Sequence, residues 1–234
     1  MNFTQPKSKR HASQGDTKKK GDLYANLKLL EKAAFQKFFR EHGLREEEIL
    51  GDGNCFFSAC AQQAIWLEKI SSKDFKVVDL DYRQRLSWEM RQDVCDFMRD
   101  AGDYSSLFGS NSHTADLFSS SARSLDEYIF KMRQPCEYAD EMVVAAVARQ
   151  RERDIQVYKY DENSGIRMIL YRKDPTSQDG QDTEMNQDPN CDLLGTPDTV
   201  RIVYYAHQLA KDGHYNSIIA DKVCERSLDP SPLD

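Results

Sequence analysis

The order of helical and strand-like patterns along this chain restricts its fold more than any other feature. Apolar residues recur at helical spacing from Leu23 to His42, and similar patterns continue to about residue 150. Patterns typical of β-strands begin only at Asp154. A run of helices followed by a run of strands is typical of an α+β or three-layer domain, and the sequence predicts this fold class.

Individual elements follow from the same patterns. Gly43 is expected to end the first helix, and residues 45–48 indicate a solvated run of charges. Further helices are expected over residues 55–69, 82–99, 124–132 and 139–150. Strands are expected over residues 154–160, 168–171, 199–206 and 215–219, with a turn at Asn163-Ser164-Gly165 pairing the first two.

The composition changes at three places and suggests the domain limits. Residues 1–21 are polar and basic, which predicts a disordered arm. A role in nuclear import or in binding an anionic surface is the alternative to a plain solvated tail. One domain is expected over residues 22–222, with a long polar insertion at 172–199 and a C-terminal tail at 223–234.

Charge and cysteine usage exclude several classes of protein. The net charge of −7 argues against a general nucleic-acid binder. No segment approaches the roughly 18 apolar residues of a membrane span, and no signal peptide is visible. The six cysteines form no CxxC pair and none has a histidine at zinc-ligand spacing, so we expect no metal site. Free thiols in a reducing, cytoplasmic compartment are expected, with a monomer as the default state.

Cys55 is the cysteine best placed to act as a nucleophile. It follows the loop Gly51-Asp52-Gly53-Asn54 and opens a predicted helix, whose N-terminus would stabilise a thiolate. Backbone amides of a glycine-containing loop can also form an oxyanion hole. The alternative is a buried structural thiol, which is the usual role of a cysteine and the one expected of the other five.

His214 is the most suitable base among the five histidines. It begins a predicted strand directly after the turn at Asp212-Gly213, and a strand end holds a base more firmly than a loop does. Asn216 is two residues further along and therefore lies on the same face of the strand. An amide at that position can orient the imidazole, although an ordinary strand histidine would show the same pattern.

These two motifs resemble those of the ovarian tumour (OTU) cysteine proteases, which are mostly deubiquitinases. Gly51-Asp52-Gly53-Asn54-Cys55-Phe56-Phe57 is similar to the family's nucleophile motif, and His214-Tyr215-Asn216 is similar to its second motif. The helices predicted between them also resemble the family pattern. The resemblance covers roughly residues 44–219. Tyr138-Ala139 departs from it, since Trp-Gly is usual there, and the insertion at 172–199 is longer than the family's connection.

The resemblance implies a papain-like fold in which a small central sheet lies between helical layers. Cys55 would be the nucleophile, His214 the general base and then acid, and Asn216 the group that orients His214. Asp52 would shape the oxyanion pocket mainly through its backbone, with Gly53 and Asn54 contributing amides. The ring of Tyr215 would border a channel for the ubiquitin tail.

The reaction implied is hydrolysis of isopeptide bonds at the ubiquitin C-terminus, with ubiquitin or polyubiquitin chains as partners and no cofactor. Three alternatives remain. One is a protease for another ubiquitin-like modifier or for a peptide bond, and another is a catalytically silent ubiquitin-binding module. The third is a structural domain with a chance motif. Some members of the family are effectors, for which the location would be the host cytoplasm.

Overall fold

The computed structural model of the chain describes residues 14–71, 80–101, 124–174, 199–207 and 213–220. Its centre is a mixed sheet with the strand order β1-β5-β4-β2-β3. The strands are β1 (Leu44–Glu47), β2 (Ile155–Asp161), β3 (Gly165–Tyr171), β4 (Val200–Tyr205) and β5 (His214–Ala220). Only the β2–β4 pair is parallel among the described strands.

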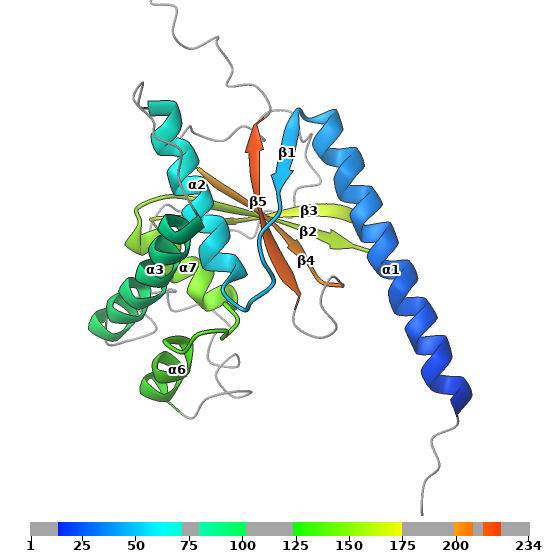
Figure 1. Cartoon of the computed structure of the whole chain (residues 1–234), viewed down its shortest axis with the longest axis horizontal. Coiled ribbons are helices and arrows are strands. Elements are labelled where there is room, and N and C mark those ends of the chain that lie inside the picture. The colour runs from blue at the N-terminus through cyan, green and yellow to red at the C-terminus, as the bar shows by residue number, and fades with distance from the viewer. Residues whose placement is uncertain (1–13, 72–79, 102–123, 175–198, 208–212, 221–234) are drawn as a thin grey trace, which may run out of the picture.

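Helices cover both faces of the sheet, as Figure 1 shows. The helices are α1 (Gln14–Glu41), α2 (Cys55–Ser71), α3 (Leu80–Ala101), α6 (Leu125–Met132) and α7 (Glu141–Gln150). Helix α1 lies on one face, while α2 and α7 lie on the other, with α3 and α6 packed behind them. These layers confirm the predicted α+β class.

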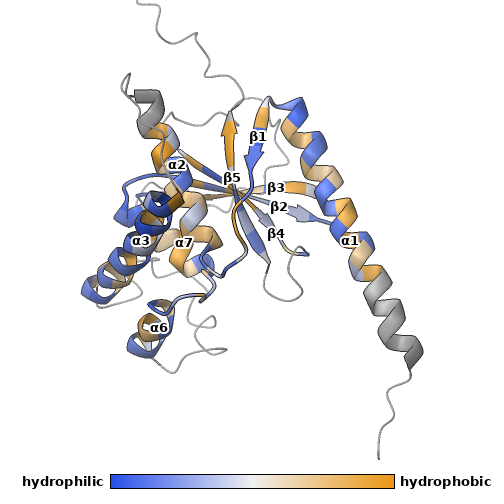
Figure 2. Cartoon of the chain, viewed as in Figure 1, coloured by the Kyte–Doolittle hydropathy of each residue, from blue (hydrophilic) through white to orange (hydrophobic). Residues whose placement is uncertain are grey.

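Each face of the sheet has its own hydrophobic core. Ile155 and Val157 of β2 point toward α2, α3 and α7, whereas Tyr158 points toward Phe35 of α1. This is the alternation that the sequence predicts for β2. In Figure 2, α3 and α6 carry both hydrophilic and hydrophobic residues, as expected for helices with one face on a core.

The expected turn residues and caps form. Gly43 has a φ of 61° and ends α1 in the left-handed conformation. Asp140 caps α7 by accepting from the backbone N–H groups of Met142 and Val143, both at 3.1 Å, so the helix begins at Glu141 rather than at residue 139. The predicted hairpin of β2 and β3 is confirmed, with Asp161 paired with Gly165.

Two expectations need correction. Helix α1 begins at Gln14, so residues 14–21 are helical rather than part of a disordered arm. The charge run at residues 45–48 is mostly strand β1, which pairs antiparallel with β5. The other predicted elements are found within a few residues of their expected limits. Residues 1–13, most of the insertion (175–198) and the C-terminal tail lie outside the described residues.

Among the helices that the structure describes, none is long and apolar enough to cross a membrane.

Candidate active site

The loop before Cys55 is held by its own polar side chains. Asp52 Oδ1 accepts a hydrogen bond from the backbone N–H of Asn54 at 2.8 Å. The carbonyl oxygen of Asn54 accepts from the N–H of Ser58 at 2.9 Å, which begins helix α2. Cys55 is therefore the first residue of the helix, where the backbone N–H groups have no intrahelical acceptor.

Gly53 allows this loop to approach the chain at Cys136. Its φ is 79°, and a Cβ at this position would lie 2.4 Å from the Cα of Cys136. No side chain fits that space without displacing backbone. Glycine is therefore required for two reasons: the positive φ and the close approach of the Cys136 backbone.

Arg91 joins the same loop to the core. Its guanidinium is fully buried and donates from Nη2 to the carbonyl oxygen of Gly53 at 3.0 Å and to Asn54 Oδ1 at 2.7 Å. It also donates to the carbonyl oxygens of Met132 and Glu137, both at 2.8 Å. The guanidinium carbon lies 4.5 Å from the centre of the Phe57 ring. One buried cation thus fixes the loop, the first turn of α2 and the segment after α6.

Cys55 is buried, with a relative exposure of 1%. Burial raises the pKa of its thiol, while the backbone N–H groups of Tyr215, Phe56 and Cys55 itself favour the thiolate and oppose that rise. Burial therefore outweighs the stabilisation that the backbone N–H groups at the start of α2 give to the thiolate. The interaction with the Tyr215 amide places the sulfur beside the beginning of β5.

His214 and Asn216 are in direct contact. His214 Nε2 lies 2.8 Å from Asn216 Oδ1, and both residues are buried at 2% exposure. The other ring nitrogen, Nδ1, is buried and makes no hydrogen bond to any residue that the structure describes. The structure thus brings together the histidine and the amide that the sequence predicts as partners.

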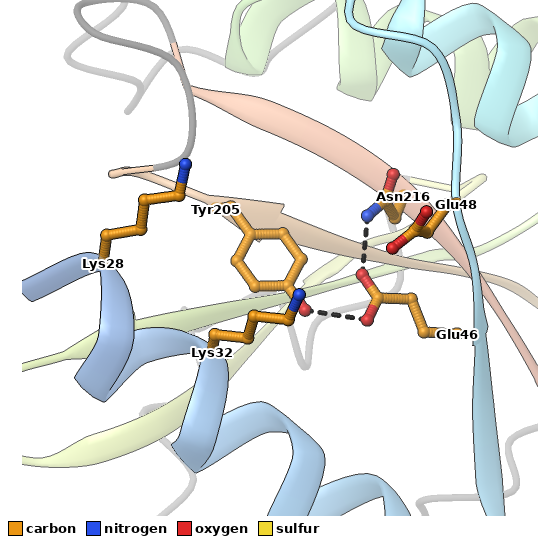
Figure 3. Close-up of a pocket in the computed structure, with 6 residues that line it drawn as sticks. All are labelled: Lys28, Lys32, Glu46, Glu48, Tyr205 and Asn216. Carbon is orange, nitrogen blue, oxygen red and sulfur yellow. Dashed lines mark hydrogen bonds between the residues drawn. The ribbon is translucent and has the colours of Figure 1, made fainter. Parts of the chain in front are cut away.

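Asn216 has two further partners, which come from β1 and the segment after it. Its Oδ1 accepts from the backbone N–H of Ile49 at 2.9 Å, and its Nδ2 donates to Glu46 Oε1 at 2.6 Å. The other oxygen of Glu46 accepts from the hydroxyl of Tyr205 at 2.9 Å. Figure 3 shows this chain of contacts from Asn216 through Glu46 to Tyr205.

Tyr215 is a core residue in this structure. Its ring packs against those of Phe56, at 5.4 Å between centres, and Tyr204, at 4.9 Å. Burial raises the pKa of its hydroxyl well above 10.0. Whether the ring also borders a substrate channel stays a prediction.

Three residues that sequence reasoning missed hold the site in place: Glu46, Arg91 and Gln63, whose amide donates to Ser217 Oγ and to the carbonyl oxygen of Ile218 on β5. Gln63 and Arg91 interrupt the buried apolar faces of α2 and α3 at helical spacing, a signal that could have identified them. Glu46 gave no such signal, because it lies within a run of charged residues.

The remaining described thiols and imidazoles have structural surroundings. Cys60 and Cys95 are buried, and burial raises their pKa values to about 12 and about 11. Cys136 is exposed. His42 Nδ1 contacts the carbonyl oxygen of Phe38 at 2.7 Å, and the ring of His207 lies edge-on to that of Tyr24. Within the described residues, no three side chains of His, Cys, Asp or Glu form a group able to hold a metal ion.

One family model matches most of the chain. A family model described as OTU-like cysteine protease matches residues 50–215. The solved OTU domain of OTUD1 is 16% identical with a TM-score of 0.51, covering 83% of this chain and 98% of that chain. At this identity the match supports the fold, and it agrees with the papain-like fold that the resemblance implies.

Two further solved structures are less similar. An OTU deubiquitinase from Wolbachia pipientis wMel, solved bound to ubiquitin, is 13% identical with a TM-score of 0.47, covering 76% of this chain and 97% of that chain. The viral OTU domain protease from Dera Ghazi Khan virus is 12% identical with a TM-score of 0.45, covering 76% and 82%. Comparison with curated proteins finds no match to the chain.

Proposed function

Because the chain belongs to the family of OTU-like cysteine proteases, we propose that it is a deubiquitinase that hydrolyses isopeptide bonds at the ubiquitin C-terminus with Cys55, His214 and Asn216. The contact between His214 Nε2 and Asn216 Oδ1 carries this proposal, because it leaves Nδ1 as the nitrogen able to exchange a proton. Ubiquitin is the proposed modifier because the family consists mostly of deubiquitinases.

The positions of the protons on His214 and Cys55 support these roles. An amide oxygen only accepts hydrogen bonds, so the neutral imidazole carries its proton on Nε2 and its lone pair on Nδ1. Burial raises the pKa of the Cys55 thiol, so the thiol needs a base to form the nucleophile near neutral pH. In the proposed reaction the thiol proton moves to His214 Nδ1, and the thiolate attacks the carbonyl carbon of the ubiquitin C-terminal glycine.

The remaining steps reuse the same groups. The negative charge on the tetrahedral intermediate needs backbone N–H donors. Since the N–H of Asn54 already bonds to Asp52, we assign this role to the N–H of Cys55 at the start of α2. The imidazolium then donates its proton to the departing lysine amine, leaving a thioester between Cys55 and ubiquitin. His214 next takes a proton from the water that attacks the thioester carbonyl, and it returns this proton to the Cys55 sulfur as the C–S bond breaks and ubiquitin leaves with a free carboxylate.

The decisive experiment uses ubiquitin with an electrophilic C-terminus. The wild-type protein should form a covalent adduct, Cys55→Ala should form none, and Cys136→Ser should react like the wild type because it removes an exposed thiol that has no role in the proposed reaction. No adduct from a folded wild-type protein would contradict ubiquitin as the substrate. Probes built from other ubiquitin-like modifiers would then identify the modifier or, if none reacts, favour a peptide substrate or a silent binding module.

A further inference from the structure

The carboxylate of Glu46 lies against the amide nitrogen of Asn216. Resting on the function proposed above, we propose that Glu46 is a positioning residue that selects the reactive tautomer of His214. The Glu46 side chain acts through Asn216, because Nδ2 of Asn216 donates to Glu46 Oε1 at 2.6 Å while Oδ1 faces the imidazole.

An asparagine amide has two ends of similar shape, and its neighbours decide which end points where. A backbone N–H such as that of Ile49 only donates, so it requires the oxygen of Asn216. A carboxylate such as that of Glu46 only accepts, so it requires the nitrogen. Turning the amide by half a turn would set donor against donor at Ile49 and acceptor against acceptor at Glu46.

The orientation of the amide then determines where the imidazole carries its proton. With Oδ1 held against His214 Nε2, the neutral ring gains a hydrogen bond only when Nε2 is protonated. The lone pair is thereby placed on Nδ1, the nitrogen assigned above to the exchange with Cys55. A reversed amide would present an N–H group to Nε2 and favour the opposite tautomer, which has no lone pair on Nδ1.

Glu46 itself is held in place by the sheet. It pairs with Ile218 in the β1–β5 register, so its side chain lies on the same face as that of Asn216. The Tyr205 hydroxyl donates to its second oxygen, and burial together with the Glu46 carboxylate raises the pKa of Tyr205, which keeps that hydroxyl a donor.

A small cavity of about 130 Å³ lies beside these groups, lined also by Lys28, Lys32 and Glu48. Figure 3 shows Lys32 of α1 pointing toward Tyr205 and Glu46. Water entering the space left by a shortened Glu46 side chain could donate or accept, so it would not distinguish the two ends of the amide.

The first test compares rates of cleavage of a fluorogenic ubiquitin substrate. Glu46→Ala should lower kcat/KM about tenfold, the lower end of the loss found for groups that orient metal-binding histidines. The loss should fall on kcat, because Glu46 acts on His214 through Asn216. Glu46→Gln should recover most of the rate, since its carbonyl oxygen can still accept from Asn216. Glu48→Ala is the matched control, because Glu48 lines the same cavity, and it should keep the wild-type rate.

The second test reads the tautomer directly and does not depend on turnover. In a Cys55→Ala background with the imidazole neutral, the ¹⁵N chemical shifts of His214 separate the protonated from the unprotonated nitrogen. We expect the proton on Nε2 with Glu46 present, and a mixture of the two tautomers with Glu46→Ala. A His214→Gln variant assigns the signals.

The two tests separate failure of this inference from failure of the proposed function. An unchanged tautomer and an unchanged kcat in Glu46→Ala would overturn the positioning role. If the wild type leaves ubiquitin substrates intact while Glu46→Ala still shifts the tautomer of His214, the positioning role of Glu46 stands and ubiquitin is refuted as the substrate. If Glu46→Ala fails to fold, Glu46→Met replaces it, because methionine keeps the length of the side chain but accepts hydrogen bonds only weakly, and the same changes in tautomer and kcat are expected.

Discussion

Gln63 Nε2 lies 2.7 Å from Ser217 Oγ and 2.6 Å from the carbonyl oxygen of Ile218, so a fully buried amide joins α2 to β5. Cys55 is eight residues earlier on the same helix, about 12 Å along its axis. His214 and Asn216 precede Ser217 on the strand. The contact therefore fixes the position of the nucleophile's helix relative to the strand that carries the imidazole.

Replacing Gln63 by Leu should show how much its contacts between α2 and β5 stabilise the fold. The substitution leaves the Ser217 hydroxyl and the Ile218 carbonyl buried without that donor, so the free energy of unfolding should fall by about 1–3 kcal/mol. Urea unfolding measures the loss. Gln62→Leu changes a neighbouring, less buried glutamine on the same helix and should cost less than half as much. Equal losses in the two variants would show that the buried amide has no special role.

A methyl group at Gly53 should disrupt the nucleophile loop. Gly53→Ala must adopt a positive φ and displace the Cys136 backbone, whereas Gly165→Ala has the same φ of 79° with open space around its Cβ. The second variant should lose about 1–2 kcal/mol from conformation alone. Gly53→Ala should lose more and should also slow the reaction of Cys55 with the ubiquitin probe. If the two variants behave alike, the contact with Cys136 is unimportant.

Lysine should not substitute for Arg91. It has the charge but not the planar fork, so it cannot reach the Gly53, Asn54, Met132 and Glu137 oxygens together. Arg91→Lys should lower the free energy of unfolding by about 2–4 kcal/mol and reduce probe labelling of Cys55. Arg99→Lys, on the exposed side of α3, provides the control for charge-conserving substitution. Wild-type stability in Arg91→Lys would mean that the charge alone suffices.

The reactivity of Cys55 should depend on His214 and on pH. Only the thiolate reacts with iodoacetamide, and burial raises the thiol pKa, so without a base the reaction should require higher pH. We expect the alkylation profile of His214→Gln to shift to higher pH than that of the wild type. Mass spectrometry of the Cys55 peptide in a Cys136→Ser background measures it, and buried Cys60 and Cys95 should stay unmodified. Coincident profiles would exclude His214 as the base.

Glu31 should make stability depend on pH in an unusual direction. It is fully buried on α1, and burial raises its pKa above 4.5, although the N–H groups of Ala206 and His207 partly oppose this. The folded state then binds the proton more tightly than the unfolded state does. The contribution of Glu31 is therefore full below about pH 4.5 and is lost as the pH rises through the folded-state pKa.

Glu31→Gln should remove this dependence, because glutamine does not titrate. The stability of Glu31→Gln relative to the wild type should increase between pH 4.5 and 7, as measured by urea unfolding at several pH values. Glu41→Gln, exposed on the same helix, should show no such trend. A constant difference between Glu31→Gln and the wild type would contradict the raised pKa.

Local patterns predicted most of the fold. Helices α2, α3, α6 and α7 and the hairpin of β2 and β3 follow from spacing and turn residues, which act within a few positions of the chain. Strand β1 was missed because residues 45–47 are charged and have low strand propensity. Its conformation depends on pairing with β5, about 170 residues later in the sequence.

The candidate site also has residues that the sequence predicted and residues that it did not. Cys55, His214 and Asn216 could be named from two short motifs, and the structure places His214 against Asn216. The residues that hold them could not be paired from sequence, since Gln63 meets Ser217 and Arg91 meets Gly53 only after the chain has folded. The start of α1 at Gln14 was also missed. The polar and basic composition of that stretch predicted disorder, although its lysines have a favourable helix propensity.

The position of β1 has a practical consequence for anyone expressing a shorter form of this protein. A fragment cut to the family-matched limits, 50–215, would lack α1, β1 and Asn216. One face of the sheet, with Tyr158 and Val203, would be stripped of its cover and exposed to water. We expect such a fragment to aggregate rather than fold, and we expect the smallest autonomous unit to extend beyond the family boundaries at both ends.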